Sequence, residues 1–205
     1  MGNTIDSTQK LVEEKIKTFK RGTVFFLDSF ENSGSNEAVR QALSRLQCAH
    51  FIHRLAKGIY LYPKINKEIG ILYPSVDLVA RLVAKRDKAR ILPTGVTALN
   101  LLGISTQVPL NVVYLTDGLP RKIEVGDQTI HFKKSTTKSF AYKSEYVYMV
   151  VASLKEIGEM QCSDKTKEMV LKMVQSEDIN VIKQDLKLAS SWIRKYINAF
   201  LTNND

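Results

Sequence analysis

The chain has 205 residues, of which 44% are hydrophobic and 25% charged, a composition that excludes a disordered or fibrous protein and allows one large or two small cores. Its formal net charge is +9, and Lys plus Arg outnumber Asp plus Glu by 10 to 6 in residues 1–64 and by 11 to 6 in residues 65–140, whereas residues 141–205 are neutral. This asymmetry favours a first part that binds a polyanion, with a basic surface that only aids solubility as the alternative.

The first predicted element is an amphipathic helix over residues 7–19 that ends before Gly22. Its apolar face consists of Leu11, Val12, Ile16 and Phe19. A β-branched and aromatic run at residues 23–26 predicts a strand, and a short helical turn is expected around residues 28–32. The chain thus begins with a helix, a strand and a short helical turn.

The clearest periodicity lies in residues 36–47, where Ser35 is the candidate N-cap. The apolar face comprises Ala38, Val39, Ala42, Leu43 and Leu46. The opposite face comprises Glu37, Arg40, Gln41, Ser44 and Arg45. Arg forms paired hydrogen bonds with guanine, and Asn or Gln with adenine, so this polar face suits base edges in the major groove. A helix face that only meets solvent is the alternative.

Residues 51–55 and 59–63 predict two strands joined by the turn Ala56-Lys57-Gly58. We expect the basic groups His53, Arg54 and Lys57 at the tip of this hairpin, and residues 51–64 contain no acid. The element order is that of a winged helix-turn-helix, which we assign to residues 1–66 as a DNA-binding domain. The candidate DNA-binding residues are Ser35, Asn36, Glu37, Arg40, Gln41, Ser44, Arg45, His53, Arg54 and Lys57.

Residues 67–205 predict a second, mixed α/β domain, which makes the whole chain α+β. Its part up to residue 140 is expected to hold a small antiparallel sheet, and residues 141–205 a helical part. The expected elements are a helix from Val76, a strand at 91–92, a helix at 96–102 stopped by Gly103, a three-stranded meander at 112–116, 122–125 and 129–133, and helices near 145–158, 164–175 and 177–200 with Ser163 and Ser176 as N-caps.

The sequence predicts a cytoplasmic protein without metal, cofactor or catalytic site. No apolar run approaches the length of a membrane span, and the polar start lacks the apolar core of a signal peptide. Cys48 and Cys162 match no metal-ligand spacing and are expected to be reduced packing residues. Asp117 and Asp127 are a candidate carboxylate pair, but each lies in a predicted turn, where Asp binds the backbone.

Two stretches of the chain resemble a known family. The run VRQALSRL at residues 39–46, followed by KGIY at 57–60, is similar to the N-terminal winged helix of AbiEi-like antitoxins of type IV toxin-antitoxin (abortive infection) systems. The run LPTGVTALNLLG at residues 92–103, with VYLTDG at 113–118, resembles that family's second domain. The likeness covers roughly residues 10–135.

The resemblance implies an autorepressor that binds double-stranded DNA of its own promoter and counteracts a nucleotidyltransferase-like toxin without an obligatory direct contact. It implies that Arg40, Gln41, Ser44 and Arg45 face the major groove and that Arg54 and Lys57 reach the backbone. A non-catalytic adaptor that binds other proteins through the winged helix and the helical tail is the alternative. Salt dependence separates the two, because DNA affinity falls steeply with salt.

Overall fold

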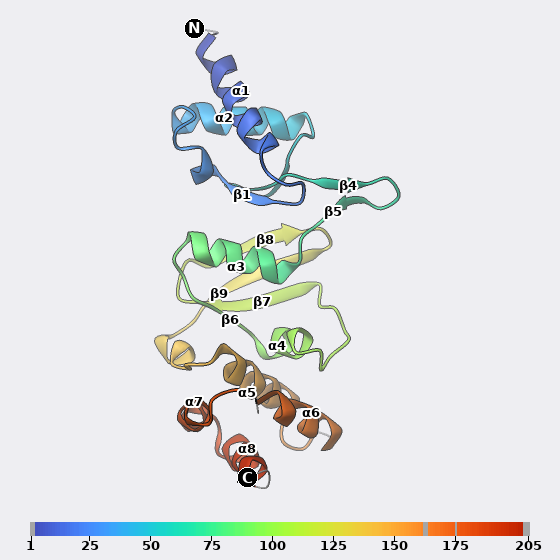
Figure 1. The fold of residues 1–205 in the computed structure, drawn as a ribbon, viewed down its shortest axis with the longest axis vertical. Helices are drawn as coiled ribbons and strands as arrows, with labels where there is room; N and C mark the ends of the chain where they lie inside the picture. The colour runs from blue at the N-terminus through green and yellow to red at the C-terminus, as the bar shows by residue number, and fades with distance from the viewer. Residues whose placement is uncertain (1–2, 162–163, 175, 203–205) are drawn as a thin grey trace. The chain divides into compact units, whose positions relative to one another are not determined.

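The computed structural model describes residues 3–161, 164–174 and 176–202 (Figure 1). The chain divides into two compact units. The first contains the chain up to Val83 together with Lys122–Ile130, and the second contains Ala84–Arg121 together with the chain from His131 onward. The predicted class is confirmed at the level of a mixed α+β protein with small antiparallel sheets and helices in its C-terminal part.

Three helical segments occur in the N-terminal part of the first unit: α1 (Asn3–Lys17), the 3-10 turn η1 (Leu27–Phe30) and α2 (Asn36–Cys48). All three lie within a few residues of the predicted ranges. Helix α2 begins as expected, because the hydroxyl of Ser35 accepts a hydrogen bond from the backbone N–H of Ala38 at 3.2 Å. That bond satisfies one of the N–H groups that a helix leaves free at its start.

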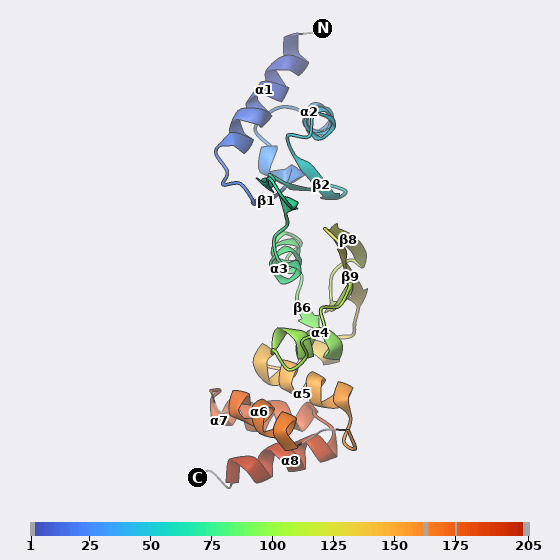
Figure 2. The same cartoon turned by 90° about the vertical axis from the view of Figure 1, so that its right-hand side faces the viewer.

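One hydrophobic core joins these helices to the adjoining strands, and Figure 2 shows α1 and α2 on one side of the strands. Its helical and aromatic members include Val12, Ile16, Phe25, Phe30, Val39, Ala42, Leu43 and Leu46. Leu11, predicted on the same face of α1, is 51% exposed. The buried face of α1 is therefore narrower than the sequence pattern indicated, because within Ser7–Lys17 the buried positions are Thr8, Val12 and Ile16, spaced four residues apart.

The first sheet has three strands, β1 (Val24–Phe26), β2 (His53–Ala56) and β3 (Ile59–Leu61), in the order β1-β3-β2. Both pairings are antiparallel. The predicted hairpin is confirmed, and Gly58 in its turn has φ +76°. A residue without Cβ adopts this left-handed conformation at little cost, which explains glycine at this turn.

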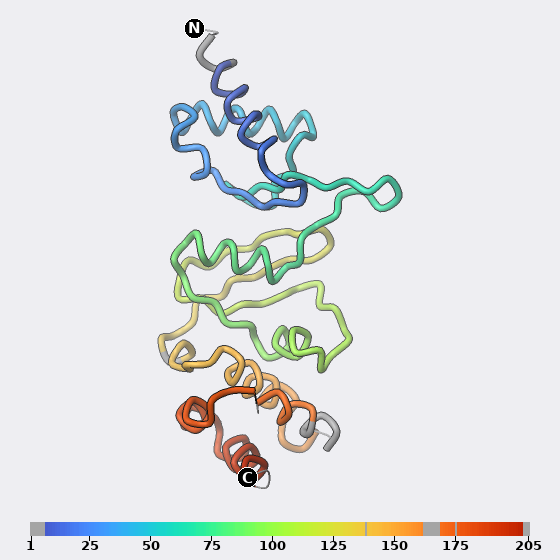
Figure 3. The backbone as a smooth tube through the Cα atoms, viewed as in Figure 1, coloured from blue at the N-terminus to red at the C-terminus, as the bar shows by residue number. Residues whose placement is uncertain are grey.

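A second, two-stranded sheet was not expected from the sequence. It is formed by β4 (Lys64–Asn66) and β5 (Gly70–Leu72), which pair antiparallel (Figure 3). The turn is closed by the side chain of Asn66, which accepts hydrogen bonds from the backbone of Glu68 and Ile69. An Asn that binds the backbone two residues onward is a local turn signal, but three-residue strands are too short to show alternation.

The next elements are α3 (Val76–Arg86) and the four strands of the largest sheet. The strands are β6 (Ile91–Pro93), β7 (Asn111–Thr116), β8 (Arg121–Val125) and β9 (Gln128–Lys134), in the order β6-β7-β9-β8. The predicted meander is therefore wrong in strand order, although its three strands exist. A tight turn after β7 would place β8 beside it; instead, the backbone N–H of Ser135, just after β9, donates to the carbonyl of Thr116 at the end of β7.

Helix α4 (Gly95–Leu101) begins at a glycine because α5 (Glu145–Ile157) lies close to it. A Cβ on Gly95 would come 2.7 Å from the Cβ of Glu156 and 2.9 Å from the carbonyl oxygen of Ala152. Both distances are too short for a real contact. The glycine of the LPTG run is therefore explained by close helix packing.

The C-terminal helices are α6 (Asp164–Val174), α7 (Ile179–Asp185), the 3-10 turn η3 (Leu186–Leu188) and α8 (Ser191–Thr202), with another 3-10 turn, η2 (Thr137–Phe140), ahead of α5. The single helix predicted over residues 177–200 is wrong. Helix α7 ends at Asp185, which is 1% exposed. The Asp185 carboxylate accepts hydrogen bonds from the backbone N–H groups of Lys143 and Ser144. This tertiary bond lies where the helix ends.

The predicted caps of these helices need correction. Asp178, not Ser176, caps α7 by accepting from the backbone of Asn180 and Val181. The hydroxyl of Ser176 instead donates to the carbonyl of Met173. The expected N-cap at Ser163 lies outside the described residues.

Cysteine usage also differs from the expectation. Cys48 is the last residue of α2, and its thiol is free and exposed. It is therefore not a packing residue. Cys162 lies outside the described residues, so its predicted packing role stays a prediction.

Candidate nucleic-acid interface

Helix α2 presents the polar face that its sequence predicts. Val39, Ala42, Leu43 and Leu46 are at most 4% exposed, whereas the polar residues of the opposite side are all exposed. These exposed residues are Asn36, Glu37, Arg40, Gln41, Ser44 and Arg45. The helix is therefore fixed by one face and offers hydrogen-bonding side chains on the other.

Gln41 and Arg45 each form one long hydrogen bond within the protein, whereas Arg40 forms none in the described part of the chain. The amide of Gln41 donates to the carboxylate of Glu37 at 3.4 Å, one helical turn earlier. Arg45 donates to the side-chain oxygen of Gln9 in α1 at 3.3 Å. Within the described ranges, Arg40 forms no hydrogen bond or ion pair through its guanidinium. Its five N–H donors are available to a ligand.

The turn between β2 and β3 places Lys57 in solvent, next to Gly58. The backbone N–H of Leu27 donates to the carbonyl of Gly58 at 3.2 Å, which fixes this turn to the segment that leads into α2. Arg54 is exposed, and its Nε donates to the carbonyl of Ala56 at 3.3 Å. Two cations therefore lie on a hairpin anchored to η1, the 3-10 turn that precedes the polar-faced helix.

His53 is not at the tip of the hairpin, contrary to the prediction. It begins β2 opposite Leu61, at the end of the strand pair away from Lys57. Its ring is half-buried and packs edge-on against Tyr73 with centroids 5.5 Å apart, and the Tyr73 hydroxyl lies 3.4 Å from Nε2. Because a strand rises about 3.3 Å per residue, His53 lies the full length of β2 from the tip.

Aromatic packing orients the hairpin on α2. The rings of Tyr60 and Phe25 stack with centroids 5.7 Å apart, and those of Tyr62 and Phe51 lie 5.4 Å apart. Both tyrosines belong to the same core as the apolar face of α2. The helix and the hairpin are therefore held to one another by a common core rather than by a flexible linker.

Arg21 is a basic residue near this sheet that no sequence motif marks. Its guanidinium lies 4.5 Å from the centroid of the Tyr62 ring and donates to the carbonyl of Pro63 at 3.2 Å. The adjacent Gly22 N–H donates to the carbonyl of Tyr62. Arg21 and Pro63 are 42 residues apart in the sequence, and the pairing of β1 with β3 brings them together.

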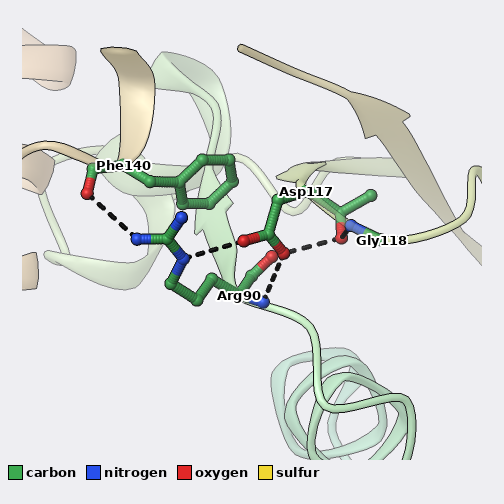
Figure 4. Close-up of polar contacts among 5 residues, drawn as sticks. Arg90, Asp117, Gly118 and Phe140 are labelled. Atoms are coloured by element: carbon green, nitrogen blue, oxygen red, sulfur yellow. Dashed lines mark hydrogen bonds and ion pairs between the residues drawn. The ribbon is translucent and has the colours of Figure 1, made fainter. Parts of the chain in front are cut away.

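The second unit contains a polar cluster that explains the TDG run at residues 116–118 (Figure 4). Asp117 accepts from the backbone N–H and the Nε of Arg90, at 2.7 and 2.8 Å, and Arg90 also lies over the ring of Phe140. The hydroxyl of Thr116 donates to the carbonyl of Arg90 and accepts from the N–H of Gly118. Hydrogen bonding from Arg90 lowers the pKa of the Asp117 carboxyl.

A cleft of about 510 Å³ adjoins the start of α4. Its walls include Thr94, Gly95, Ser139, Tyr142, Tyr148 and Lys155. The hydroxyl of Tyr148 donates to the carbonyl of Pro93 at 3.1 Å, and burial raises the pKa of this phenol to about 12. Tyr148 is therefore a neutral hydrogen-bond donor that ties α5 to β6.

No set of three or more His, Cys, Asp or Glu residues gathers at metal-binding distance in the part of the chain that the structure describes. None of the described helices is long and apolar enough to cross a membrane. The two best-defined polar arrangements are thus the exposed face of α2 with its hairpin and the Arg90–Asp117 cluster.

These features define a mixed α+β protein with a polar-faced helix and a basic hairpin on one core. Residues 11–182 match the model of a family of unknown function, DUF6088, and the chain belongs to this family. No curated protein matches the chain in a sequence comparison.

Proposed function

We propose that the protein is a sequence-specific DNA-binding transcriptional regulator whose N-terminal elements form a winged helix-turn-helix. In this proposal, α2 enters the major groove and the β2–β3 hairpin is the wing. The observation that carries it is the exposed face of α2, with Arg40 and Gln41 unburied beside a hairpin that carries Lys57. The element order α1, β1, η1, α2, β2, β3 supports the same assignment.

The charge and chemistry of this surface favour DNA over a protein partner. Arg40, Gln41 and Ser44 are the side-chain types that hydrogen-bond to base edges, and Arg54 and Lys57 suit phosphates. Only Glu37 adds an acid to the exposed face of α2, and its carboxylate already accepts from Gln41. A base-reading surface with basic groups at its margin is the pattern expected of direct readout.

The narrower proposal is an antitoxin that represses its own promoter and counteracts a nucleotidyltransferase-like toxin. It rests on the resemblance of the VRQALSRL and LPTGVTALNLLG runs to AbiEi-like antitoxins. The polar cluster of the second unit gives the TDG run a structural role, so that run alone does not support an interaction with a toxin.

The test is binding of the purified protein to labelled DNA from just upstream of its own gene, at two salt concentrations and against scrambled competitor DNA. We expect binding that survives the competitor and whose log affinity falls with log salt by about 0.9 for each phosphate contacted. Arg40→Ala should lower specific affinity by about 1 to 3 kcal/mol, as for a lost base contact. Lys195→Ala, an exposed cation of α8, is the charge-matched control.

The result that would refute the proposal is an affinity that does not change with salt, or equal affinity for the upstream and scrambled DNA. Equal losses for Arg40→Ala and Lys195→Ala would refute the assignment of α2 as the reading helix, because only net charge would then matter.

A further inference from the structure

The β4–β5 hairpin is largely exposed to solvent. Every residue from Lys64 to Gly70 is exposed, including Ile65 at 64% and Ile69 at 72%. Two-stranded hairpins of this size gain little stability in water by themselves. Figure 3 shows the hairpin reaching outward from the three-stranded sheet. Its two apolar side chains therefore remain available to a partner.

Hydrogen bonds within the turn fix the backbone conformation of the β4–β5 hairpin. The Oδ1 atom of Asn66 accepts hydrogen bonds from the backbone of Glu68 at 2.8 Å and of Ile69 at 3.2 Å. Gly70 completes the turn with φ +77°. In the antiparallel register Ile65 lies opposite Ile71, so these two side chains share one face. The turn thus fixes the backbone that carries Lys67 and Ile69.

Basic side chains surround the base and tip of this hairpin. Lys64 and Lys67 are exposed within it, and Arg21 is fixed at its base by the Tyr62 ring and the Pro63 carbonyl. Glu68 is the single acid of residues 64–72. The surface combines cations with exposed isoleucines, and this combination is typical of hairpins and arms that bind the DNA minor groove.

The β2–β3 turn and the β4–β5 hairpin lie at opposite ends of strand β3. Lys57 lies at the end of β3 that begins with Ile59, whereas the β4–β5 hairpin follows the other end, after Leu61. The three-stranded sheet therefore carries a basic hairpin at each end, and both ends join the core that fixes α2. The positive charge of both hairpins is complementary to an extended polyanion.

We propose that the β4–β5 hairpin is a second DNA contact, in which Lys64 and Lys67 bind backbone phosphates and Ile65 and Ile69 lie against the minor groove. This inference rests on the proposed DNA-binding function and adds a contact that the winged-helix assignment does not include. It also gives a role to the exposed side chains of Ile65 and Ile69.

The first experiment compares the salt dependence of binding to the upstream DNA for the full chain and for Lys64→Gln/Lys67→Gln, by fluorescence anisotropy. Loss of two phosphate contacts should lower the slope of log affinity against log salt by about 1.8. The control is Lys183→Gln/Lys187→Gln, which removes the same charge from exposed positions in α7 and η3. Its slope should equal that of the parent protein.

The second experiment replaces the isoleucines, as Ile65→Ser/Ile69→Ser. Affinity for the upstream DNA should fall by about tenfold with an unchanged salt slope, since apolar contact is lost but no charge is. Sedimentation of the free protein serves as the check on a protein contact. A variant whose self-association changes while its DNA affinity does not would show that the hairpin binds a second copy, and would overturn the proposal.

The outcomes distinguish this inference from the function on which it rests. A parent protein without salt-dependent DNA binding overturns both. If the parent protein binds DNA but the salt slope of Lys64→Gln/Lys67→Gln changes no more than that of Lys183→Gln/Lys187→Gln, the hairpin contact alone is overturned. Because residues 64–70 are exposed and outside the cores, unfolding midpoints in urea should agree for all these proteins, so a binding loss is not a folding loss.

Discussion

Asp117 accepts hydrogen bonds from two groups of Arg90, the backbone N–H at 2.7 Å and the guanidinium Nε at 2.8 Å (Figure 4). The guanidinium also donates to the carbonyl of Phe140 at 3.4 Å. This carboxylate thus ties the segment before β6 to the segment after β7, and Arg90 extends the connection to η2. The sequence pattern offered Asp117 as a turn residue, and the structure gives it a tertiary role as well.

Asp117→Ala should lower the free energy of unfolding by about 1 kcal/mol, because hydrogen bonds to the Arg90 backbone and side chain are lost. The value is small because the Asp117 side chain is 30% exposed and that of Arg90 59% exposed, so water screens the ion pair. Urea unfolding measures the change. Asp127→Ala, at an exposed turn, is the control. An equal loss of stability there would contradict a stabilising role of the Arg90–Asp117 hydrogen bonds.

The Asp117 carboxyl should also make stability depend on pH in the acid range. Hydrogen bonding from Arg90 lowers its folded-state pKa below the ordinary value of 3.8. A lowered folded-state pKa means that the stabilisation is present above pH 3.8 and is lost as the pH falls through the lowered value. The difference in unfolding free energy between the parent and Asp117→Asn should therefore be constant near neutral pH and shrink in acid. A constant difference throughout would disprove the ion-pair contribution.

Gly95→Ala should destabilise the second unit by about 1 to 3 kcal/mol, as for an overpacked core position. The added methyl group would meet the backbone carbonyl of Ala152 at 2.9 Å, and a backbone atom cannot move aside as a flexible side chain can. Thermal or urea unfolding measures the loss. Val96→Ala, at the next and exposed position of α4, should change stability by a few tenths of a kcal/mol.

Asp185→Ala should cost about 2 to 3 kcal/mol of unfolding free energy, since charge-assisted bonds to the N–H groups of Lys143 and Ser144 disappear in a buried place. Asp185→Asn keeps one acceptor oxygen and should lose less. Asp178→Ala, which removes only the exposed cap of α7, is the comparison at about 1 kcal/mol. Urea unfolding measures the three losses, and Asp185→Ala should show the largest.

Lys57→Ala should weaken binding to all DNA sequences alike, because a phosphate contact carries no sequence information. Its salt slope should fall by about 0.9 relative to the parent. Anisotropy titrations with upstream and scrambled DNA measure both quantities. A loss confined to the upstream sequence would place Lys57 at a base edge instead.

Much of the candidate interface could be read from the sequence because its determinants are local. The period of α2 separates Val39 and Leu43 from Arg40 and Ser44 within a single helix, and the exposed and buried faces are confirmed. The position of His53 could not be read in the same way. Its distance from the hairpin tip depends on where β2 starts to pair with β3, and its contact with Tyr73 spans 20 residues.

The sequence by itself determined the α+β class, the N-terminal order of helices and strands, and the polar face of α2, because side-chain period and turn residues act over a few positions. Only the tertiary structure decided the strand order β6-β7-β9-β8, the division of the last helix at Asp185 and the base of the β4–β5 hairpin beside Arg21. Each of these depends on a hydrogen bond or strand pairing between distant segments. Such partners are chosen by the packed fold as a whole, so no local pattern of residues specifies them.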